Sequence, residues 1–350
     1  MIGATGVRSA AAAETMTMCI RRAVRGEDLS MSDVRAAVEA IVDGEASEAQ
    51  VGALLAALAT KGETADELAG AADALRERML EVHSANAPLL DVCGTGGDGS
   101  GSFNISTAVA FVAAGAGATV AKHGNRAMSS RCGSADVLSA LGVRVDASPA
   151  TSARALEEVG IAFLFAQAHH PAMRAVAPAR REIGIRSIFN LVGPLANPAR
   201  AQRQVVGVAD ERAVRTVAEA LRRLGSERAA AVRGHDGMDE VSLSGPTRVV
   251  EWTGSQIMEY EIDPASLGLE RSELPALRGG DADENAHIVR TVFAGGSGPQ
   301  SDVIALNAAL ALVIAGIASD LRDGLRRARF SIASGAAATK LAGLVRVSTS

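Results

Sequence analysis

The chain has 350 residues, more than one hydrophobic core usually serves, so we expect two domains or one large domain with an appendage. Hydrophobic residues make up 48%, but only 3% are aromatic, and the abundance of small residues indicates close packing of helices and loops. The net charge of -5 argues against a general affinity for nucleic acid or an anionic membrane, because both would require a positive face.

The cysteines and the N-terminal segment indicate the compartment. Cys19, Cys93 and Cys132 are odd in number and widely separated, so they predict neither a disulfide framework nor a zinc cluster and favour a reducing cytoplasm. Residues 1–17 are rich in small residues but lack the basic start and apolar run of a secretory signal. No later stretch approaches a membrane span. We expect residues 1–17 to be a disordered extension.

Residues 18–86 have a helical pattern throughout. Ser47 with Gln50, and Thr64 with Glu67, match the capping box that opens a helix. Apolar residues recur between them at helical spacing, at Val51, Leu54, Leu55 and Leu58. The pattern predicts a small helical domain, joined by helices within about 170–195. Its apolar face must pack on something, which suggests a homodimer.

From residue 87 to residue 350 short apolar segments alternate with turns and helices. The expected strands are residues 89–93, 119–121, 161–165, 205–208 and 229–232. This alternation predicts a large α/β domain with a mainly parallel central sheet, whose functional loops lie at the C-terminal ends of the strands. Residues 249–262, broken by Gly254 and Ser255, indicate a hairpin that adds antiparallel strands, and residues 302–344 return to helix.

The first predicted strand runs into a glycine-rich loop, residues 94–102, and then into the start of an alanine-rich helix at residues 104–107. Glycines let the backbone approach an anion closely, and the amides at a helix start favour negative charge, so the loop predicts phosphate binding. The loop matches neither a Walker sequence nor a well-spaced dinucleotide fingerprint. A flexible turn is the alternative.

The second predicted strand leads into another polar loop, residues 122–136. Lys122, Arg126 and Arg131 supply three cations there, together with several hydroxyl groups and two glycines. Such a loop can offer charge-assisted hydrogen bonds as well as backbone amides, so it predicts a second polyanion cradle. A solvated basic loop is the alternative.

Together the two loops closely resemble the signature segments of the anthranilate phosphoribosyltransferase family. The resemblance continues, in the family's order, through residues 180–190, 193–198 and 237–242, and it covers nearly the whole chain from about Cys19 onward. It implies a fold of the nucleoside phosphorylase/phosphoribosyltransferase kind. It also implies a pentosyltransferase of tryptophan biosynthesis, which moves the 5-phosphoribosyl group of phosphoribosyl pyrophosphate to the amine of anthranilate, giving N-(5-phosphoribosyl)anthranilate and pyrophosphate.

The resemblance also implies which residues bind each ligand. Those matching the phosphoribosyl pyrophosphate site are Gly94, Gly97, Asp98, Ser102, Asn104, Ile105, Ser106, Thr107, Lys122, His123, Gly124, Asn125, Arg126, Ala127, Met128, Ser129, Ser130 and Ser134. Those matching the anthranilate site are Gly94, His123, Asn125, Arg180, Gly193 and Pro194, with Arg180 facing the carboxylate. Those matching the Mg²⁺ ligands, for two ions per subunit, are Ser106, Asp239 and Glu240.

The chemistry explains why no acid, base or nucleophile is implied. The aromatic amine is neutral at pH 7, so the difficult task is to stabilise the leaving pyrophosphate and an oxocarbenium-like ribose. Magnesium takes one or two carboxylates and completes its octahedron with phosphate oxygens and water. Without the motif context, Asp239 and Glu240 would be an ordinary acidic pair on the surface, and Arg180 an ordinary helix arginine.

Two other functions remain open at this point. A pyrimidine nucleoside phosphorylase would share the fold and the phosphate loop, but it needs neither paired magnesium carboxylates nor Arg180. A non-catalytic relative that binds nucleic acid would need a broad basic surface, which the net charge of -5 disfavours. We therefore expect small-molecule substrates, a homodimer, and neither nucleic acid nor membrane as partner.

Overall fold

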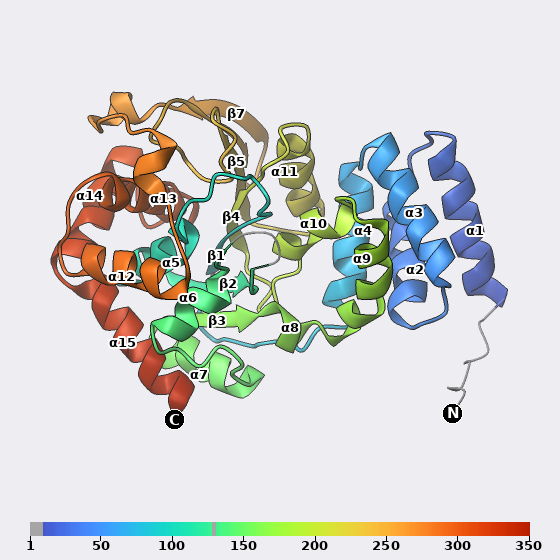
Figure 1. The fold of residues 1–350 in the computed structure, drawn as a ribbon, viewed down its shortest axis with the longest axis horizontal. Coiled ribbons are helices and arrows are strands. Elements are labelled where there is room, and N and C mark those ends of the chain that lie inside the picture. Colours follow the sequence, from blue (N-terminus) through green and yellow to red (C-terminus); the bar gives the residue numbers. More distant parts are fainter. Residues whose placement is uncertain (1–9, 128–130) are drawn as a thin grey trace. The chain divides into compact units, whose positions relative to one another are not determined.

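The structure is a computed structural model that describes residues 10–127 and 131–350. It consists of two compact units (Figure 1). Unit 1 comprises Met1–Leu80 and His170–Ala196, and unit 2 comprises Glu81–His169 and Asn197–Ser350. The small helical domain that we predicted, residues 18–86 with helices from about 170–195, differs from unit 1 mainly at its ends.

The described residues of unit 1 form helices and connecting turns. The bounds are α1 Ala10–Val24, α2 Met31–Val42, α3 Glu48–Lys61, α4 Ala65–Arg76, η1 Pro171–Ala175, α9 Ala177–Ile183, α10 Ile188–Val192 and η2 Gly193–Leu195. Both predicted capping boxes are present, with Ser47 opening α3 and Thr64 opening α4. Helix α1 packs on α3, α2 packs on α4, and α9 packs on α3.

Helix α1 begins inside the segment that we expected to be disordered. Along it, Met16, Cys19 and Ala23 are buried at spacings of three and four residues, which places them on one helix face. The prediction was wrong for residues 10–17: it rested on their richness in small residues, but Ala12 and Met16 are buried on this helix. Residues 1–9 lie outside the described part of the chain.

Unit 2 is built on a seven-stranded sheet of order β3-β2-β1-β4-β5-β6-β7. The bounds are β1 Leu89–Gly94, β2 Thr119–Gly124, β3 Ile161–Phe165, β4 Arg203–Gly207, β5 Arg228–Gly234, β6 Thr247–Trp252 and β7 Ile257–Ile262. Strands β1 to β5 pair in parallel, whereas β6 and β7 pair antiparallel. The mainly parallel sheet is confirmed, and the predicted hairpin is β6 and β7.

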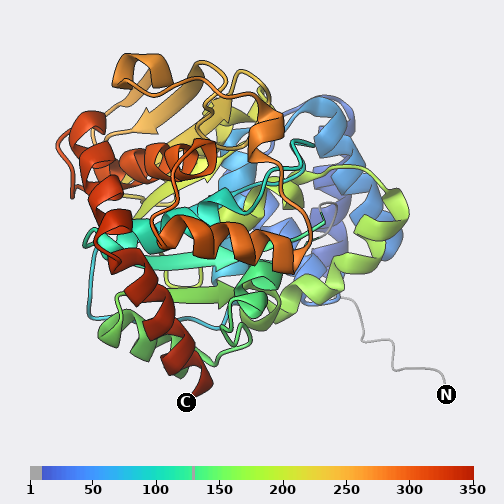
Figure 2. The ribbon, with the colours of Figure 1, turned by 60° about the vertical axis from the view of Figure 1, so that its left-hand side comes forward.

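Helices of unit 2 cover the sheet. The bounds are α5 Ile105–Gly115, α6 Ser134–Ala140, α7 Pro149–Glu158, α8 Ala166–His169, α11 Ala213–Arg223, η3 Pro264–Leu267, η4 Leu274–Leu277, α12 Ala282–Phe293, α13 Pro299–Ile314, α14 Leu321–Ala333 and α15 Ala336–Thr349. Helix α5 packs on β1 and β2, and α13, α14 and α15 pack against α5 (Figure 2). Among the described residues, no helix is both long and apolar enough to span a membrane.

The sheet brings the functional loops together. Strands β1 and β4 are parallel neighbours in a register that pairs Gly94 with Gly207, and β2, ending at Gly124, lies on the other side of β1. The loops that follow β1, β2, β4 and β5 therefore leave the same edge of the sheet. The candidate site lies at that edge.

Candidate active site

The segment between β5 and β6 carries the paired carboxylates, and we call residues 236–242 the acidic loop. A Cβ atom at Gly207 would overlap the Asp239 carbonyl group, and one at Gly94 would overlap the Asp239 carboxylate. Neither glycine has a positive φ, so the need for glycine comes from the close approach of Asp239. Asp239 thus packs directly against the backbone at the ends of β1 and β4.

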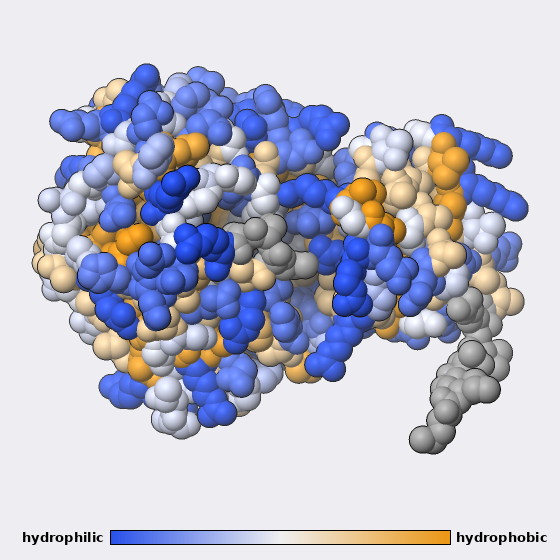
Figure 3. Space-filling model, in the orientation of Figure 1, coloured by the Kyte–Doolittle hydropathy of each residue, from blue (hydrophilic) through white to orange (hydrophobic). Residues whose placement is uncertain are grey.

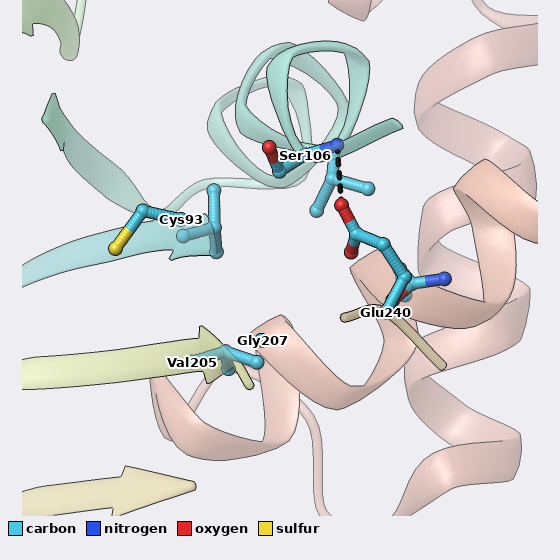
Figure 4. Close-up of a pocket in the computed structure, with 8 residues that line it drawn as sticks. Cys93, Ser106, Val205, Gly207 and Glu240 are labelled. Carbon is cyan, nitrogen blue, oxygen red and sulfur yellow. Dashed lines mark hydrogen bonds between the residues drawn. The ribbon is translucent and has the colours of Figure 1, made fainter. Parts of the chain in front are cut away.

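The two carboxylates contact two segments more than 130 positions earlier in the chain. Asp239 Oδ2 accepts a hydrogen bond from the Gly96 amide at 2.8 Å, and the Asp239 amide donates to Asp98 Oδ2 at 3.4 Å. Glu240 Oε1 accepts from the Ser106 amide at 3.1 Å (Figure 4). The structure therefore brings together Ser106, Asp239 and Glu240, the three residues that the resemblance implies as magnesium ligands.

A small cavity lies beside this junction. It is lined by Val92, Cys93, Ser106, Val109, Val205, Gly207, Glu240 and Asn307. In Figure 4 the Glu240 carboxylate points to the start of α5, where Ser106 lies. Most of the lining is apolar, so the polar groups are few and specific.

Burial and crowding of negative charge raise the pKa of both carboxyl groups. The pKa of Asp239 rises to about 7, because it is removed from water and lies near Asp98. The pKa of Glu240 rises well above its usual range, because it is buried and lies near Asp239, while Lys122 opposes the shift. A divalent cation at this point would relieve the repulsion.

The donor set fits magnesium that is held jointly with a substrate. Among the described residues, no three His, Cys, Asp or Glu side chains are grouped so that they could hold a metal ion by themselves. Magnesium does not need such a cage, since one or two carboxylates suffice when phosphate oxygens and water complete the octahedron. The crowded pair of Asp239 and Glu240 meets that requirement.

Lys122 is a buried lysine that contacts Ser106, one of the proposed magnesium ligands. Its side chain is 3% exposed, and Nζ donates to the Val92 carbonyl at 2.7 Å and to Ser106 Oγ at 3.3 Å. Burial raises the pKa of both Asp91 and Glu240, and the charge of Lys122 opposes that rise in each. We predicted that this lysine reaches a phosphate, and that role stays a prediction. The structure shows a lysine that orients Ser106 and balances buried negative charge.

The glycine-rich loop is anchored at its C-terminal end. Gly96, Gly97, Gly99 and Gly101 all have positive φ angles, a conformation that favours glycine. The Gly279 amide donates to the Gly101 carbonyl at 2.9 Å, next to a bridge between Ser102 and Arg278. Asn285 Nδ2 donates to Asn104 Oδ1 at 2.9 Å. Segment 278–285, which the sequence analysis did not single out, thus supports the predicted phosphate cradle.

The start of α5 differs from our expectation. We predicted that its amides face a phosphate, but the Ser106 amide donates to Glu240, and the Ile105 and Thr107 amides donate to Phe103 and Asn104 carbonyls at 2.7 and 3.2 Å. The side chains of Ile105 and Thr107 are buried. The buried Thr107 hydroxyl has no hydrogen-bond partner among the described residues, and the roles of Ile105 and Thr107 in binding phosphoribosyl pyrophosphate stay predictions.

The second loop is shaped by an acidic residue that sequence reasoning did not single out. Asp136 accepts hydrogen bonds from the Ala127 and Gly133 amides at 3.0 and 2.9 Å and pairs with Arg126 at 2.8 Å. Ser134 Oγ accepts from the Asn125 amide at 3.2 Å and fills the space that a Cβ atom at Gly124 would need. Residues 128–130, which carry the predicted contacts of Met128, Ser129 and Ser130, lie outside the described residues.

Another buried acid fixes the end of β2. Asp91 is fully buried, and it accepts hydrogen bonds from the His123 amide at 3.0 Å and from Asn197 Nδ2 at 2.8 Å. Asn197 Nδ2 also donates to the Ala121 carbonyl at 2.8 Å. The available signal was a charged residue within an otherwise apolar predicted strand, which demands a partner.

The proposed carboxylate-binding arginine lies in unit 1. Arg180, in α9, is half-buried and lies 5.9 Å from the centre of the Phe189 ring, and burial lowers its pKa. Among the described residues of its unit it has no ion-pair partner, whereas Arg181 and Arg186 are exposed. A sheltered arginine with no internal counter-ion is suited to an external carboxylate. Gly193 and Pro194 belong to η2 of the same unit, and Gly94, His123 and Asn125 belong to unit 2.

Comparison with known proteins first gives the class. Residues 17–79 match the helical bundle domain of the glycosyl transferase family, and residues 86–338 match the α/β domain of that family. The first range lies within the N-terminal part of unit 1, and the second covers most of unit 2 together with residues 170–196 of unit 1. The two matches together place the chain in the glycosyl transferase family.

Individual relatives and solved structures identify the family within the glycosyl transferases. The chain is 54% identical, over 93% of its length and 96% of the relative's, to an anthranilate phosphoribosyltransferase of Roseiflexus sp. (strain RS-1). It superposes with a TM-score of 0.90 and 44% identity on the anthranilate phosphoribosyltransferase of Thermus thermophilus, covering 95% and 99% of the two chains. For the Saccharomyces cerevisiae enzyme in complex with phosphoribosyl pyrophosphate and Mg, the TM-score is 0.88 at 27% identity, with 98% and 99% covered. The chain belongs to the anthranilate phosphoribosyltransferase family.

Proposed function

We propose that this chain catalyses its family's reaction, the transfer of the 5-phosphoribosyl group from phosphoribosyl pyrophosphate to the amine of anthranilate in tryptophan biosynthesis. The observation that carries the proposal is the acidic loop, which rests on glycines at the strand ends and bonds to both the glycine-rich loop and the start of α5. A phosphorylase that binds free phosphate has no need for such a pair of carboxylates.

Ser106, Asp239 and Glu240 would hold Mg²⁺, with two ions per subunit. When bound, the metal supplies positive charge against the leaving pyrophosphate. The backbone amides of the glycine-rich loop would hold the phosphates opposite the acidic loop. Asp98, whose Oδ2 accepts a hydrogen bond from the Asp239 amide, would be a further contact of phosphoribosyl pyrophosphate. The test is the magnesium-dependent loss of anthranilate fluorescence when phosphoribosyl pyrophosphate is added. No change at any magnesium concentration would refute the proposal.

The Arg180→Ala variant should lose anthranilate binding far more than phosphoribosyl pyrophosphate binding. A charge-assisted hydrogen bond to a carboxylate contributes about 1.5 to 3 kcal/mol, so the KM for anthranilate should rise roughly 10- to 100-fold. Steady-state kinetics with each substrate varied in turn measures the split. Arg181→Ala is the matched control. The Arg181 side chain is exposed, so its removal should change the KM of either substrate little. Equal effects of the two variants would place the carboxylate site elsewhere.

Lys122→Met should weaken phosphoribosyl pyrophosphate binding, measurable by calorimetry and partly recoverable at high ligand concentration. It should also lower the free energy of unfolding by about 3 to 5 kcal/mol, as expected when one member of a buried ionic group is removed. The cost should grow as the pH rises, because without the lysine the pKa values of Asp91 and Glu240 rise further and their ionised forms are penalised. An unchanged affinity together with a pH-independent stability loss would contradict both roles.

We further propose that the enzyme is a cytoplasmic homodimer. The described cysteines are all free, which suits a reducing compartment. Hydrophobic patches occur on the visible face of unit 1 over α3 and its neighbours (Figure 3), and the exposed large hydrophobic residues of that unit include Val24, Leu80 and Ile185. Exposed apolar surface of this kind favours association of two copies. Light scattering coupled to gel filtration measures the mass in solution.

A further inference from the structure

We infer that Asn307 is a positioning residue that holds the acidic loop in place for metal binding, and this inference rests on the proposed function. Asn307 lies in α13 and is 4% exposed. From Val303 to Ile314 it is the one polar residue of a helix segment that is otherwise buried Val, Ile, Leu and Ala. A polar side chain at such a position is costly unless its hydrogen bonds are made.

The hydrogen bonds of Asn307 are made almost entirely with one residue of the acidic loop. Oδ1 accepts from the Val241 amide at 2.8 Å, and Nδ2 donates to the Val241 carbonyl at 2.8 Å. Nδ2 also donates to the Val303 carbonyl in the preceding turn at 2.9 Å. The amide group thus pairs with both backbone groups of Val241, much as a neighbouring strand would.

This pairing falls next to the carboxylates. Val241 directly follows Glu240, and its side chain is fully buried. The acidic loop contains neither helix nor strand, so no regular pattern of backbone hydrogen bonds within the loop fixes its position. Glu240 and Asn307 line the same cavity with Ser106. A shift of Val241 would therefore move Glu240 relative to Ser106.

Helix α13 also contacts the helix that carries Ser106. It packs against α5 as well as against β4 and β5. The acidic loop and helix α5, which together carry the proposed metal ligands, therefore both contact the same buried helix. Groups that support metal ligands from behind commonly change metal affinity by about 10- to 100-fold when they are removed.

The test compares Asn307→Ala with Leu310→Ala, which removes a fully buried side chain from the same helix and is not among the residues that line the cavity. Asn307→Ala should raise the Mg²⁺ concentration for half-maximal turnover about 10- to 100-fold. Binding of Mn²⁺ in the presence of inorganic pyrophosphate, followed by electron paramagnetic resonance, should weaken in parallel. Hydrogen exchange should accelerate at the Val241 amide. Leu310→Ala should lower the melting temperature but leave all three measurements near wild type.

Should Asn307→Ala fail to fold, Asn307→Ser, which replaces the amide by a single hydroxyl and so cannot pair with both backbone groups of Val241, is measured in its place. A metal dependence shared equally by the Asn307 and Leu310 variants would overturn the inference, because it would show a general packing effect. Unchanged Mn²⁺ affinity despite faster exchange at Val241 would overturn it as well. Failure of the proposed function is separate, since it would appear as wild-type protein that transfers no phosphoribosyl group.

Discussion

Replacing Asp239 by Asn together with Glu240 by Gln should reduce turnover by at least about 100- to 1000-fold, the scale seen when a group that stabilises developing charge is removed. The substitutions keep the size of both side chains but remove the two charges that would hold Mg²⁺ against the leaving pyrophosphate. Raising the magnesium concentration should restore little, because the lost element is the position of the ion as well as its occupancy.

The same double variant should fold at least as stably as the wild type. The pKa of Asp239 is raised to about 7, so in the folded metal-free protein its ionised form is disfavoured. A raised carboxyl pKa means that wild-type stability falls as the pH rises from the ordinary carboxyl range through 7. The variant lacks this penalty, so its gain in melting temperature should be larger at pH 8 than at pH 5, as measured by calorimetry without metal.

The adjacent exposed pair at the end of α7 provides the control. Glu157→Gln with Glu158→Gln removes the same number of charges from a region distant in sequence from the site and should leave turnover near wild type. Near-normal turnover of the Asp239 and Glu240 double variant at low magnesium would show that the metal is held elsewhere. A phosphorylase-like reaction, which needs no such pair, would then be the better hypothesis.

Gly207→Ala should also abolish most activity and destabilise the protein, because the substitution creates a steric overlap. Gly207 ends β4 without a positive φ, so alanine suits its own backbone, but the added methyl group would overlap the Asp239 carbonyl group. Backbone must move to relieve the overlap, at about 1 to 3 kcal/mol, and the movement displaces the metal-binding loop. We expect a fall in kcat of roughly 100-fold, consistent with the sensitivity of catalysis to misplacement by about 1 Å.

Gly52→Ala is the matched control for that substitution. Gly52 lies within α3, and the nearest atom to an added Cβ is Ile183 Cγ2 at 3.4 Å, an ordinary contact. Alanine in a helix interior is more favourable than glycine by about 0.5 to 1 kcal/mol, so this variant should melt higher and keep its activity. If Gly207→Ala kept its activity and melted higher, as expected of Gly52→Ala, the close packing of Asp239 on Gly207 would have no role in the site.

Features with a local cause were predictable from the sequence. The Ser47 and Thr64 capping boxes depend on residues three positions apart, and the strands β1 to β5 depend on short apolar runs that end in turns. The glycine-rich loop and its order before β2 are likewise local. The family resemblance required only that these motifs occur in order along one chain.

The tertiary structure alone decided how distant polar groups are paired. Glu240 occupies the start of α5, where a phosphate was expected, because the fold brings residue 240 to residue 106. Lys122 turns inward, where its charge offsets the buried carboxyl groups of Asp91 and Glu240. Asn307 is polar within an apolar helix because Val241 passes beside it. Such pairings join residues that lie 31 to 134 positions apart, and no periodicity encodes them, since the cost of a buried charge or amide is set only by what the folded chain places opposite it.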